Sequence, residues 1–188
     1  MVDLAMITAC LVLGADPGLI SAIIETESAG KIAALNINQW QGDALNLTDT
    51  ATAISAAKLF IDEGYTVDVG LMGINSENIN RFNKSVEEAF EPCTNIELGE
   101  HILMQNIESA NAAGLQADHA IRAALSLYNT GSLSAGFTNG YVQKVWSRYQ
   151  GNERIRAQLA DSRVEWTHGP SWSDEVTASA QLWRDPDE

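Results

Sequence analysis

The sequence predicts a mainly α-helical domain with a small hairpin or irregular β region, on the strength of three observations. Several segments repeat apolar residues at helical spacing between capping residues and a terminal glycine. Two stretches, 34–47 and 67–75, are interrupted by Asn and Gly, as is typical of short hairpins, irregular loops and buried turns. Hydrophobic residues make up 45% of the 188 residues, which is enough to bury one sizeable core.

The apolar stretch from Val2 to Leu13 predicts a buried first helix that ends at Gly14. A membrane span needs about 20 apolar residues, so this stretch is too short to cross a bilayer. It also carries Asp3 where an export signal carries Lys or Arg. We therefore expect no membrane span, and no export signal is visible in this sequence.

Capping residues place the next helices. Asp16 and Pro17 predict the start of a helix that runs through Ser28 and ends by Gly30. A helix capped by Thr48 or Asp49 is expected to reach Asp62 and to stop at Gly64. The glycine-interrupted run 67–75 between this helix and the next suits a buried turn that another group approaches closely.

Two capping boxes predict two helical runs on either side of Pro92. Ser85 pairs with Glu88 in the first box and Thr94 with Glu97 in the second, whose run reaches about Gly114. Asp118 is expected to begin a helix that ends at Gly131, and a last helix places apolar residues from Tyr141 to Tyr149 on one face. The pattern predicts a domain over residues 1–150 and a polar C-terminal extension over 151–188.

Charge and residue spacing exclude several classes of protein. Eleven Lys and Arg against 25 Asp and Glu give a net charge of -14, which disfavours nucleic acid and anionic lipid as partners. The histidines, His101, His119 and His168, lack metal-ligand spacing and are expected on the surface, so no metal or other cofactor is predicted. By count alone, Cys10 and Cys93 are two buried thiols or one long-range disulfide, and free thiols are favoured.

Glu27 is the residue whose position is most informative. At 100° per residue, Glu27 falls in the middle of the apolar stripe of its helix, and Glu25 falls on the opposite face. A carboxylate on a buried face is costly unless it is paired, protonated or lines a cleft. A buried salt bridge is one explanation, although basic residues are few; an acid catalyst in a cleft is the other.

Two further polar residues lie near the expected cleft. Asp68 precedes the glycine-rich turn, where capping the turn is the common role of an aspartate and a second catalytic acid is the alternative. Tyr128 lies on the core face of its helix, either as a packed aromatic or with its hydroxyl at a cleft edge.

Three motifs together resemble a known family. Glu27-Ser28 looks like the "ES" motif of goose-lysozyme-like lytic transglycosylases, 70–75 (GLMGIN) resembles their "GLMQIN", and 128–131 (YNTG) resembles their third motif. The segments 90–95 (FEPCTN) and 136–142 (GFTNGYV) resemble the branch attached to type IV secretion and conjugation machines. The resemblance covers about Cys10 to Tyr149 and implies a lysozyme-like α+β fold, with the β region lining a substrate groove.

The resemblance implies a role for each matched position. Glu27 would be the general acid and then the base, with Ser28 hydrogen-bonded near it. Tyr128 would contact and orient Glu27, and Asn129 would bind substrate or shape the groove. The floor of the sugar groove would be formed by Gly70, Leu71, Met72, Gly73 and Asn75. Gly73 replaces the usual glutamine, which weakens the expectation of full activity.

The same resemblance implies the chemistry and its setting. The substrate would be peptidoglycan glycan strands, cut between N-acetylmuramic acid and N-acetylglucosamine with formation of 1,6-anhydro-muramic ends. Secretion-machine subunits are candidate partners, the location would be periplasmic, and Cys10 and Cys93 would form a disulfide. The alternatives are a lysozyme-type hydrolase assisted by Asp68, a non-catalytic assembly factor that binds glycan, and a helical bundle with a structural Glu27.

Overall fold

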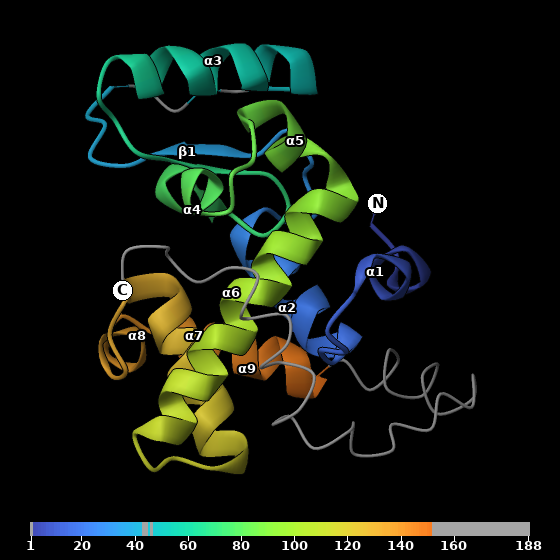
Figure 1. Ribbon diagram of the computed structural model, residues 1–188, viewed down its shortest axis with the longest axis vertical. Helices are drawn as coiled ribbons and strands as arrows, with labels where there is room; N and C mark the ends of the chain where they lie inside the picture. Colours follow the sequence, from blue (N-terminus) through green and yellow to red (C-terminus); the bar gives the residue numbers. More distant parts are fainter. Residues whose placement is uncertain (1, 43–44, 46, 152–188) are drawn as a thin grey trace. The chain divides into compact units, whose positions relative to one another are not determined.

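The computed structural model describes residues 2–42, 45 and 47–151. These residues form helices, one small sheet and the loops that connect them (Figure 1). The helices are α1 (Leu4–Cys10), α2 (Pro17–Glu27), α3 (Thr50–Asp62), α4 (Ser76–Arg81), α5 (Val86–Phe90), α6 (Pro92–Ala112), α7 (Ala117–Thr130), α8 (Ala135–Thr138) and α9 (Tyr141–Gly151). The strands are β1 (Leu35–Ile37), β2 (Val67–Val69) and β3 (Ile74–Asn75). The predicted mainly helical α+β class is therefore confirmed.

The sheet is antiparallel in the order β1-β2-β3. Leu35 pairs with Val69 across β1 and β2, and Val69 pairs with Ile74 across β2 and β3. The stretch 34–47 therefore does not form a local hairpin, because its strand pairs with a strand some thirty residues later. The predicted turn within 67–75 is present, and it joins β2 to β3 as a tight connection over 70–73.

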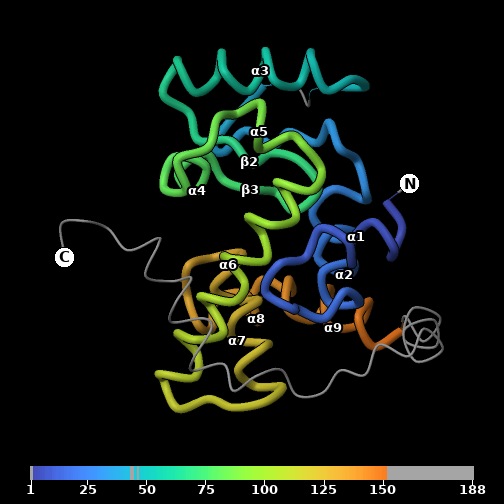
Figure 2. Tube along the Cα trace, turned by 45° about the vertical axis from the view of Figure 1, so that its right-hand side comes forward, coloured from blue at the N-terminus to red at the C-terminus, as the bar shows by residue number. Residues whose placement is uncertain are grey.

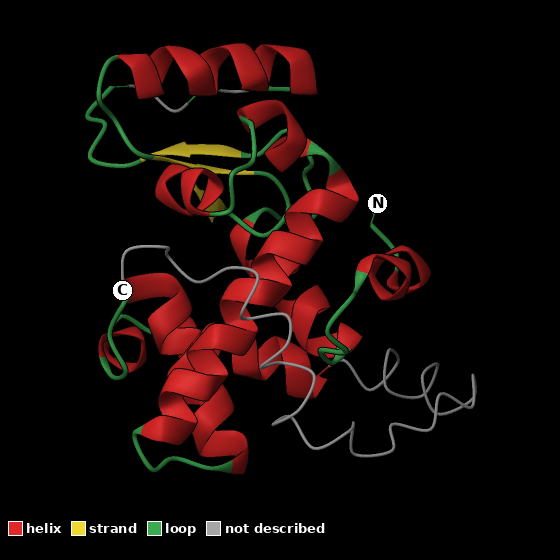
Figure 3. Ribbon diagram, viewed as in Figure 1, coloured by secondary structure: helices red, strands yellow, loops and turns green. Residues whose placement is uncertain are grey.

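Two groups of elements share the fold, and α6 runs through both (Figures 1 and 2). The sheet, α3, α4 and α5 form one group, which we call the β lobe. The helices α2, α7, α8 and α9 form the other group, the helical lobe, in which α6 packs along α7 and α2 packs along α9 (Figure 3). Buried side chains from both lobes, such as Ile23, Met72 and Leu103, belong to one continuous core.

The capping residues behave largely as the sequence predicts. Asp16 accepts hydrogen bonds from the backbone N–H groups of Gly18 and Leu19 at the start of α2. Asp49 accepts one from Thr52 at the start of α3, and Ser85 and Glu88 form the complete capping box of α5. Each of these side chains satisfies a backbone donor that the first turn of a helix leaves without a partner.

Two predicted helix starts are wrong. No Thr94–Glu97 capping box begins a helix, because Pro92 is already the first residue of α6. The ring of proline fixes φ near its helical value, so Pro92 starts the long helix instead of separating two short ones. The helix expected from Asp118 begins at Ala117, with Gln116 as its N-cap residue.

The first helix is shorter than predicted. It ends at Cys10 rather than at Gly14, with Leu11 already extended. The backbone N–H groups of Val12 and Ala15 donate hydrogen bonds of 2.7 and 2.9 Å to the buried carboxylate of Glu100 on α6. Those bonds give the 12–15 backbone partners outside a helix, so the chain crosses α6 as a loop before α2 begins.

Cys10 and Cys93 are joined by a disulfide between α1 and the start of α6. The two residues are 83 positions apart, so the count-based preference for free thiols does not describe this structure. Together with the Glu100 hydrogen bonds, the disulfide fixes the N-terminal segment against α6. The segment that leads into α2 is therefore held at two points.

The predicted boundary between residues 150 and 151 lies at the edge of the described part of the chain. The polar extension and its residues Trp166, His168, Trp172 and Trp183 lie outside the described residues. Within the described ranges, no helix is both long enough and apolar enough to cross a membrane.

Candidate active site

Helix α2 directs its two glutamates to opposite sides, as the helical phase predicts. Glu25 is exposed, and its carboxylate lies 3.6 Å from Nε of Arg148 on α9. Glu27, the last residue of α2, lines a pocket of about 500 Å³. The apolar residues Ile20, Ile23 and Ile24 of the same helix are buried, so packing of this stripe sets the direction of Glu27.

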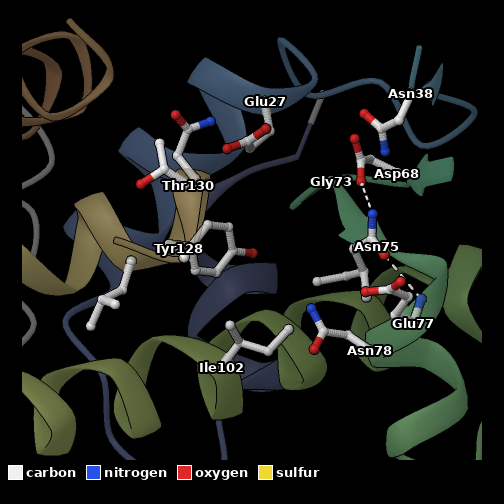
Figure 4. A pocket seen from close by; sticks show the side chains of 14 residues that line it. Glu27, Asn38, Asp68, Gly73, Asn75, Glu77, Asn78, Ile102, Tyr128 and Thr130 are labelled. Atoms are coloured by element: carbon white, nitrogen blue, oxygen red, sulfur yellow. Dashed lines mark hydrogen bonds between the residues drawn. The ribbon is translucent and has the colours of Figure 1, made fainter. Parts of the chain in front are cut away.

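The pocket lies between the β lobe and the helical lobe (Figure 4). Figure 4 shows Glu27, Tyr128 and Thr130 on the helical side and Asn38, Asp68 and Asn75 on the strand side. The lining is rich in amide and carboxyl groups, which suits a ligand with many hydroxyl and amide groups. The lining residues are Glu27, Asn38, Asp68, Gly73, Ile74, Asn75, Glu77, Asn78, Ile102, Leu127, Tyr128, Asn129, Thr130 and Gly131.

The carboxyl of Glu27 has a raised pKa of about 7. Burial is the largest cause, since it disfavours the charged form, and the negative charge of Asp68 raises the pKa further. A hydrogen bond from Tyr141 and the positive charge of Lys144 act in the opposite direction. A carboxyl with this pKa is largely protonated just below neutral pH and can give up its proton there, as a general acid must.

The hydrogen bond to Glu27 comes from Tyr141, which lies in the segment 136–142 but is not among the predicted site residues. The hydroxyl of Tyr141, the first residue of α9, donates to Oε1 of Glu27 at 2.5 Å. Tyr141 is buried, and burial together with the charge of Glu27 raises the pKa of its phenol, so the phenol keeps its proton and remains a donor. This contact takes the place of the buried salt bridge considered as an alternative role for Glu27.

Tyr128 has a different partner from the one expected. Its hydroxyl donates to the backbone carbonyl of Met72 at 2.8 Å and so ties α7 to the turn between β2 and β3. Tyr128 still lines the pocket, and burial and the charge of Glu27 raise the pKa of its phenol. It therefore joins the two walls of the pocket, while the direct hydrogen bond to Glu27 belongs to Tyr141.

Asn129 follows Tyr128 at the mouth of the pocket. Its side-chain oxygen accepts a hydrogen bond of 2.8 Å from the amide nitrogen of Asn139. This hydrogen bond holds the side chain of Asn129, which lines the pocket. Asn139 also accepts from the backbone N–H of Tyr141 at 2.9 Å. Its side chain therefore contacts both Asn129, which lines the pocket, and Tyr141, which donates to Glu27.

The turn expected to form the groove floor contributes to the pocket at only some of its positions. Gly73, Ile74 and Asn75 line the pocket, whereas Leu71 and Met72 are fully buried beneath it. The buried amide of Asn95 holds the turn in place: it donates to the carbonyls of Val69 and Ala89 and accepts from the backbone N–H of Met72.

Gly70 also serves the turn rather than the pocket lining. Its φ is +75°, and a Cβ there would lie 2.2 Å from the side-chain nitrogen of Asn95. A side chain at this position would therefore collide with the amide that holds the turn.

Gly73 lies against the carboxyl of Glu27. Its φ is +61°, in the left-handed region, and a Cβ on it would lie 2.9 Å from Oε2 of Glu27. The motif departure noted in the sequence therefore falls where the turn lies against Glu27. Any side chain at this position adds backbone strain and pushes against the carboxyl.

Asp68 does not cap a turn. It lies in β2, where its carboxylate accepts hydrogen bonds from the amides of Asn36 at 3.1 Å and Asn75 at 2.7 Å. The charge of this carboxylate is one of the causes that raise the pKa of Glu27. Asp68 thus places a negative charge on the pocket wall that faces Glu27 (Figure 4).

Ser28 does not line the pocket. Its buried hydroxyl donates to the carbonyl of Ile24 at 3.1 Å and accepts from the backbone N–H of Gly30, and so it closes the end of α2. Its effect on Glu27 is to fix where the helix ends, rather than to make a contact with the carboxyl.

The described residues include no group of three His, Cys, Asp or Glu side chains that could hold a metal ion. His101 is half-buried against Phe82, rather than on the surface as expected, and burial lowers its pKa. His119 is exposed, as predicted.

Sequence reasoning misses Tyr141, Asn95, Asn38 and Asn139 as site residues. For Tyr141 a signal is present, because a hydroxyl-bearing residue begins the apolar face of the last helix immediately after a glycine. For Asn95 the signal is its place in the segment 90–95, since nothing else in its local pattern tells a buried amide from a surface amide on a helix.

Comparison with known proteins agrees with this geometry. The family described as Transglycosylase SLT domain matches residues 6–149. Protein virB1 of Agrobacterium fabrum is 33% identical over 129 residues, which cover 69% of this chain and 52% of that protein. Type IV secretion system protein virB1 of Brucella abortus is 28% identical over 138 residues, which cover 69% of this chain and 56% of that protein.

The chain spans about half the length of these curated relatives. No solved structure gives a significant match. The family match includes both lobes, Glu27 and the whole pocket lining. The resemblance suggested by the three motifs is thus confirmed, and the chain belongs to the family of transglycosylase SLT domains.

Proposed function

We propose that the protein is a lytic transglycosylase that cleaves the β-1,4 bond between N-acetylmuramic acid and N-acetylglucosamine in peptidoglycan. The observation that carries this proposal is the carboxyl of Glu27, which has a pKa raised to about 7 and lines a polar pocket between two lobes. A protonated carboxyl in such a pocket can donate to a glycosidic oxygen near neutral pH.

The reaction requires one carboxyl in two roles. Glu27 gives its proton to the bridging oxygen, the bond from that oxygen to the muramic C1 breaks, and positive charge develops at C1. The N-acetyl group of the substrate stabilises that charge. The muramic 6-hydroxyl then attacks C1 and returns its proton to Glu27, which leaves a 1,6-anhydro end and no net consumption of water.

The other residues around Glu27 hold its carboxyl and the neighbouring turn in place and bind the glycan. Tyr141 holds the carboxyl through Oε1, and Tyr128 fixes the neighbouring turn through the carbonyl of Met72. The amides of Asn38, Asn75 and Asn129 line the pocket and suit the hydroxyl and N-acetyl groups of a glycan. No cofactor takes part in this scheme.

A lysozyme-type hydrolase is the second candidate, and the position of Asp68 favours it. A hydrolase uses a second carboxylate as nucleophile or as base for water, and Asp68 faces Glu27 across the pocket (Figure 4). The transglycosylase remains our proposal because both carboxylate oxygens of Asp68 already accept hydrogen bonds from Asn36 and Asn75. Those bonds anchor the group and weaken it as a nucleophile.

Mass spectrometry of the fragments released from purified sacculi distinguishes the candidates. Anhydro-muramic ends, one water lighter than reducing ends, are expected from a transglycosylase. Reducing ends would instead establish the hydrolase. Binding to sacculi without release of either product would favour the non-catalytic assembly factor.

We propose further that the protein acts in the periplasm, where it opens the cell wall for a secretion machine. The names of the virB1 relatives support this setting, since Brucella virB1 is described as a type IV secretion system protein. Subunits of such a machine are the expected partners, in addition to glycan strands. Retention of the protein on immobilised secretion-machine subunits, compared with an unrelated acidic protein, tests the partnership.

A further inference from the structure

A second hollow lies in the β lobe beside the Glu27 pocket. It is lined by Asn38, Gln39, Glu63, Gly64, Tyr65 and Thr66. Asn38 also lines the Glu27 pocket, so the two hollows share a wall residue. The two hollows therefore adjoin at Asn38.

Three aromatic rings stand beside this second hollow, and we call them the Trp40 platform: Trp40, Phe60 and Tyr65. Each pair of rings meets edge to face, with centroids 5.0, 5.8 and 5.7 Å apart. Gly42 packs against the indole, since a Cβ on Gly42 would lie 2.3 Å from a ring carbon of Trp40. These contacts fix the orientation of Trp40 while 41% of the residue stays exposed.

The backbone beside the platform is strained. Gln39, which lines the second hollow, has a φ of +62°, a conformation that costs about 1 kcal/mol or more for a residue with a side chain. Strain of this kind persists only where the surrounding structure holds the residue in that conformation. Gln39 lies in the chain between Asn38, which lines both hollows, and the partly exposed Trp40.

We infer that the second hollow and the Trp40 platform form a distal subsite for the continuing glycan strand. Sugar rings present an apolar face of C–H groups, which packs on an aromatic ring, and a rim of hydroxyl and acetamido groups, which bind amides. Trp40 offers the ring, and Asn38 and Gln39 offer the amides. This inference rests on the proposed function, because continuity with the Glu27 pocket identifies the occupant.

The distance between the two features is short enough for one strand to cover both. One residue separates Asn38 from Trp40, and the two Cα–Cα steps between them span about 7 Å at most in a fully extended chain. A strand several sugars long that is bound at Glu27 therefore reaches the platform, whereas a short fragment confined to the Glu27 pocket does not. The subsite predicts a preference for long strands.

Binding measured in a Glu27→Gln background tests the subsite independently of cleavage. The probes are peptide-free glycan strands, prepared long and short, titrated with tryptophan fluorescence and with a pull-down on immobilised strands. Trp40→Ala should weaken the binding of long strands about tenfold, which corresponds to about 1.4 kcal/mol, and should leave short fragments unaffected. Trp40→Phe should keep part of the affinity but lose the fluorescence response.

Leu59→Ala is the matched control, because Leu59 is 59% exposed on α3 in the same lobe and is not part of the platform. It should bind both lengths like the parent protein. Equal binding of long strands by Trp40→Ala and its parent would overturn the subsite, even if the wild type cleaves glycan. Conversely, Trp40-dependent binding by a wild type that releases no product would overturn the proposed function and leave the subsite standing.

Discussion

The phenol of Tyr141 donates a 2.5 Å hydrogen bond to Oε1 of Glu27, across 114 residues of sequence. The contact joins the end of α2 to the start of α9. It stabilises the charged form of Glu27 and so acts against burial, which raises the pKa of the carboxyl. The balance of the two effects leaves a carboxyl that can both release and recover a proton near neutral pH.

Glu27→Gln should abolish release of glycan fragments, whereas Glu25→Gln should retain most of it. Of these two glutamates, Glu27 lines the pocket and Glu25 does not. Loss of a general acid lowers rates by about 10²–10⁴, with a greater loss where the same group is also the base. The measurement is the rate of product release from sacculi, with thermal unfolding as the check on folding. Equal loss from both substitutions would contradict the assignment.

The pH profile should respond in opposite directions to changes at Tyr141 and Asp68. The protonated acid is required, so kcat/KM of the wild type should fall as pH rises through about 7. Tyr141→Phe removes an interaction that lowers the pKa of Glu27, so this limb should move to higher pH. Asp68→Asn removes a charge that raises the pKa, so the limb should move to lower pH.

A Lys31→Gln variant serves as the control for general charge effects, because Lys31 is exposed and does not line the pocket. Its profile should match that of the wild type. If Tyr141→Phe and Asp68→Asn moved the limb in the same direction, the causes assigned to the pKa of Glu27 would be wrong.

The free energy of unfolding should also depend on pH because of Glu27. Its pKa is about 7 in the folded protein against 4.5 as the ordinary value, so the folded state binds more protons between these two pH values. Stability from this group is therefore full below pH 4.5 and is lost as pH rises through 7.

Glu27→Gln removes that loss, so the variant should gain stability over the wild type as pH rises. The difference should grow by at most about 3 kcal/mol between pH 4.5 and pH 8. Urea unfolding of the two proteins across this range measures it. A constant difference would mean that the carboxyl titrates normally and is not shifted by burial.

Local signals predict most of the fold because they act within a few residues. The Asp16–Pro17 start of α2 and the capping box of α5 each depend on neighbours in sequence, and both are present as predicted. The pairing of β1 with β2 and the end of α1 depend on distant partners, namely residues 67–69 and Glu100, which local patterns do not contain. Those features are not predicted correctly, and the starts of α6 and α7 also differ from the prediction.

In the candidate site, too, local patterns predict some features, and others depend on distant partners. Helical phase places Glu27 correctly, since the direction of its side chain follows from the apolar stripe of its own helix. The partner of that side chain lies on α9, and motif resemblance alone assigns it to Tyr128 rather than Tyr141. Both tyrosines lie close to the pocket, and only the coordinates decide which hydroxyl reaches the carboxyl.

Cys10 and Cys93 should contain no free thiol in the native protein. The bridge links α1 to the start of α6, and a cross-link that closes a loop of this length stabilises by about 4 kcal/mol in the chain-entropy model. Thiol titration of the unfolded, unreduced protein measures the bridge, with the reduced protein as the control. Two reactive thiols per chain before reduction would exclude it.

Gly73→Gln restores the usual motif residue, and sequence reasoning alone would have it raise turnover through one more substrate contact. The structure argues for the opposite result. At a φ of +61° any side chain is strained, and a Cβ would lie 2.9 Å from Oε2 of Glu27, so the carboxyl must shift away from its position. We therefore expect Gly73→Gln and Gly73→Ala both to lower kcat.

The comparison of these two variants separates strain from lost or gained contacts. Strain and displacement begin at Cβ, so the alanine variant should already show most of the loss, on the order of tenfold if about 1–2 kcal/mol falls on the transition state. Gly114→Ala is the matched control, since Gly114 also has a positive φ, meets no atom within 4 Å of its Cβ position and lines neither hollow. It should lose stability without a comparable loss of kcat. Higher kcat in Gly73→Gln, with Gly73→Ala unchanged, would show that the turn adapts and that the glutamine binds substrate as the family motif implies.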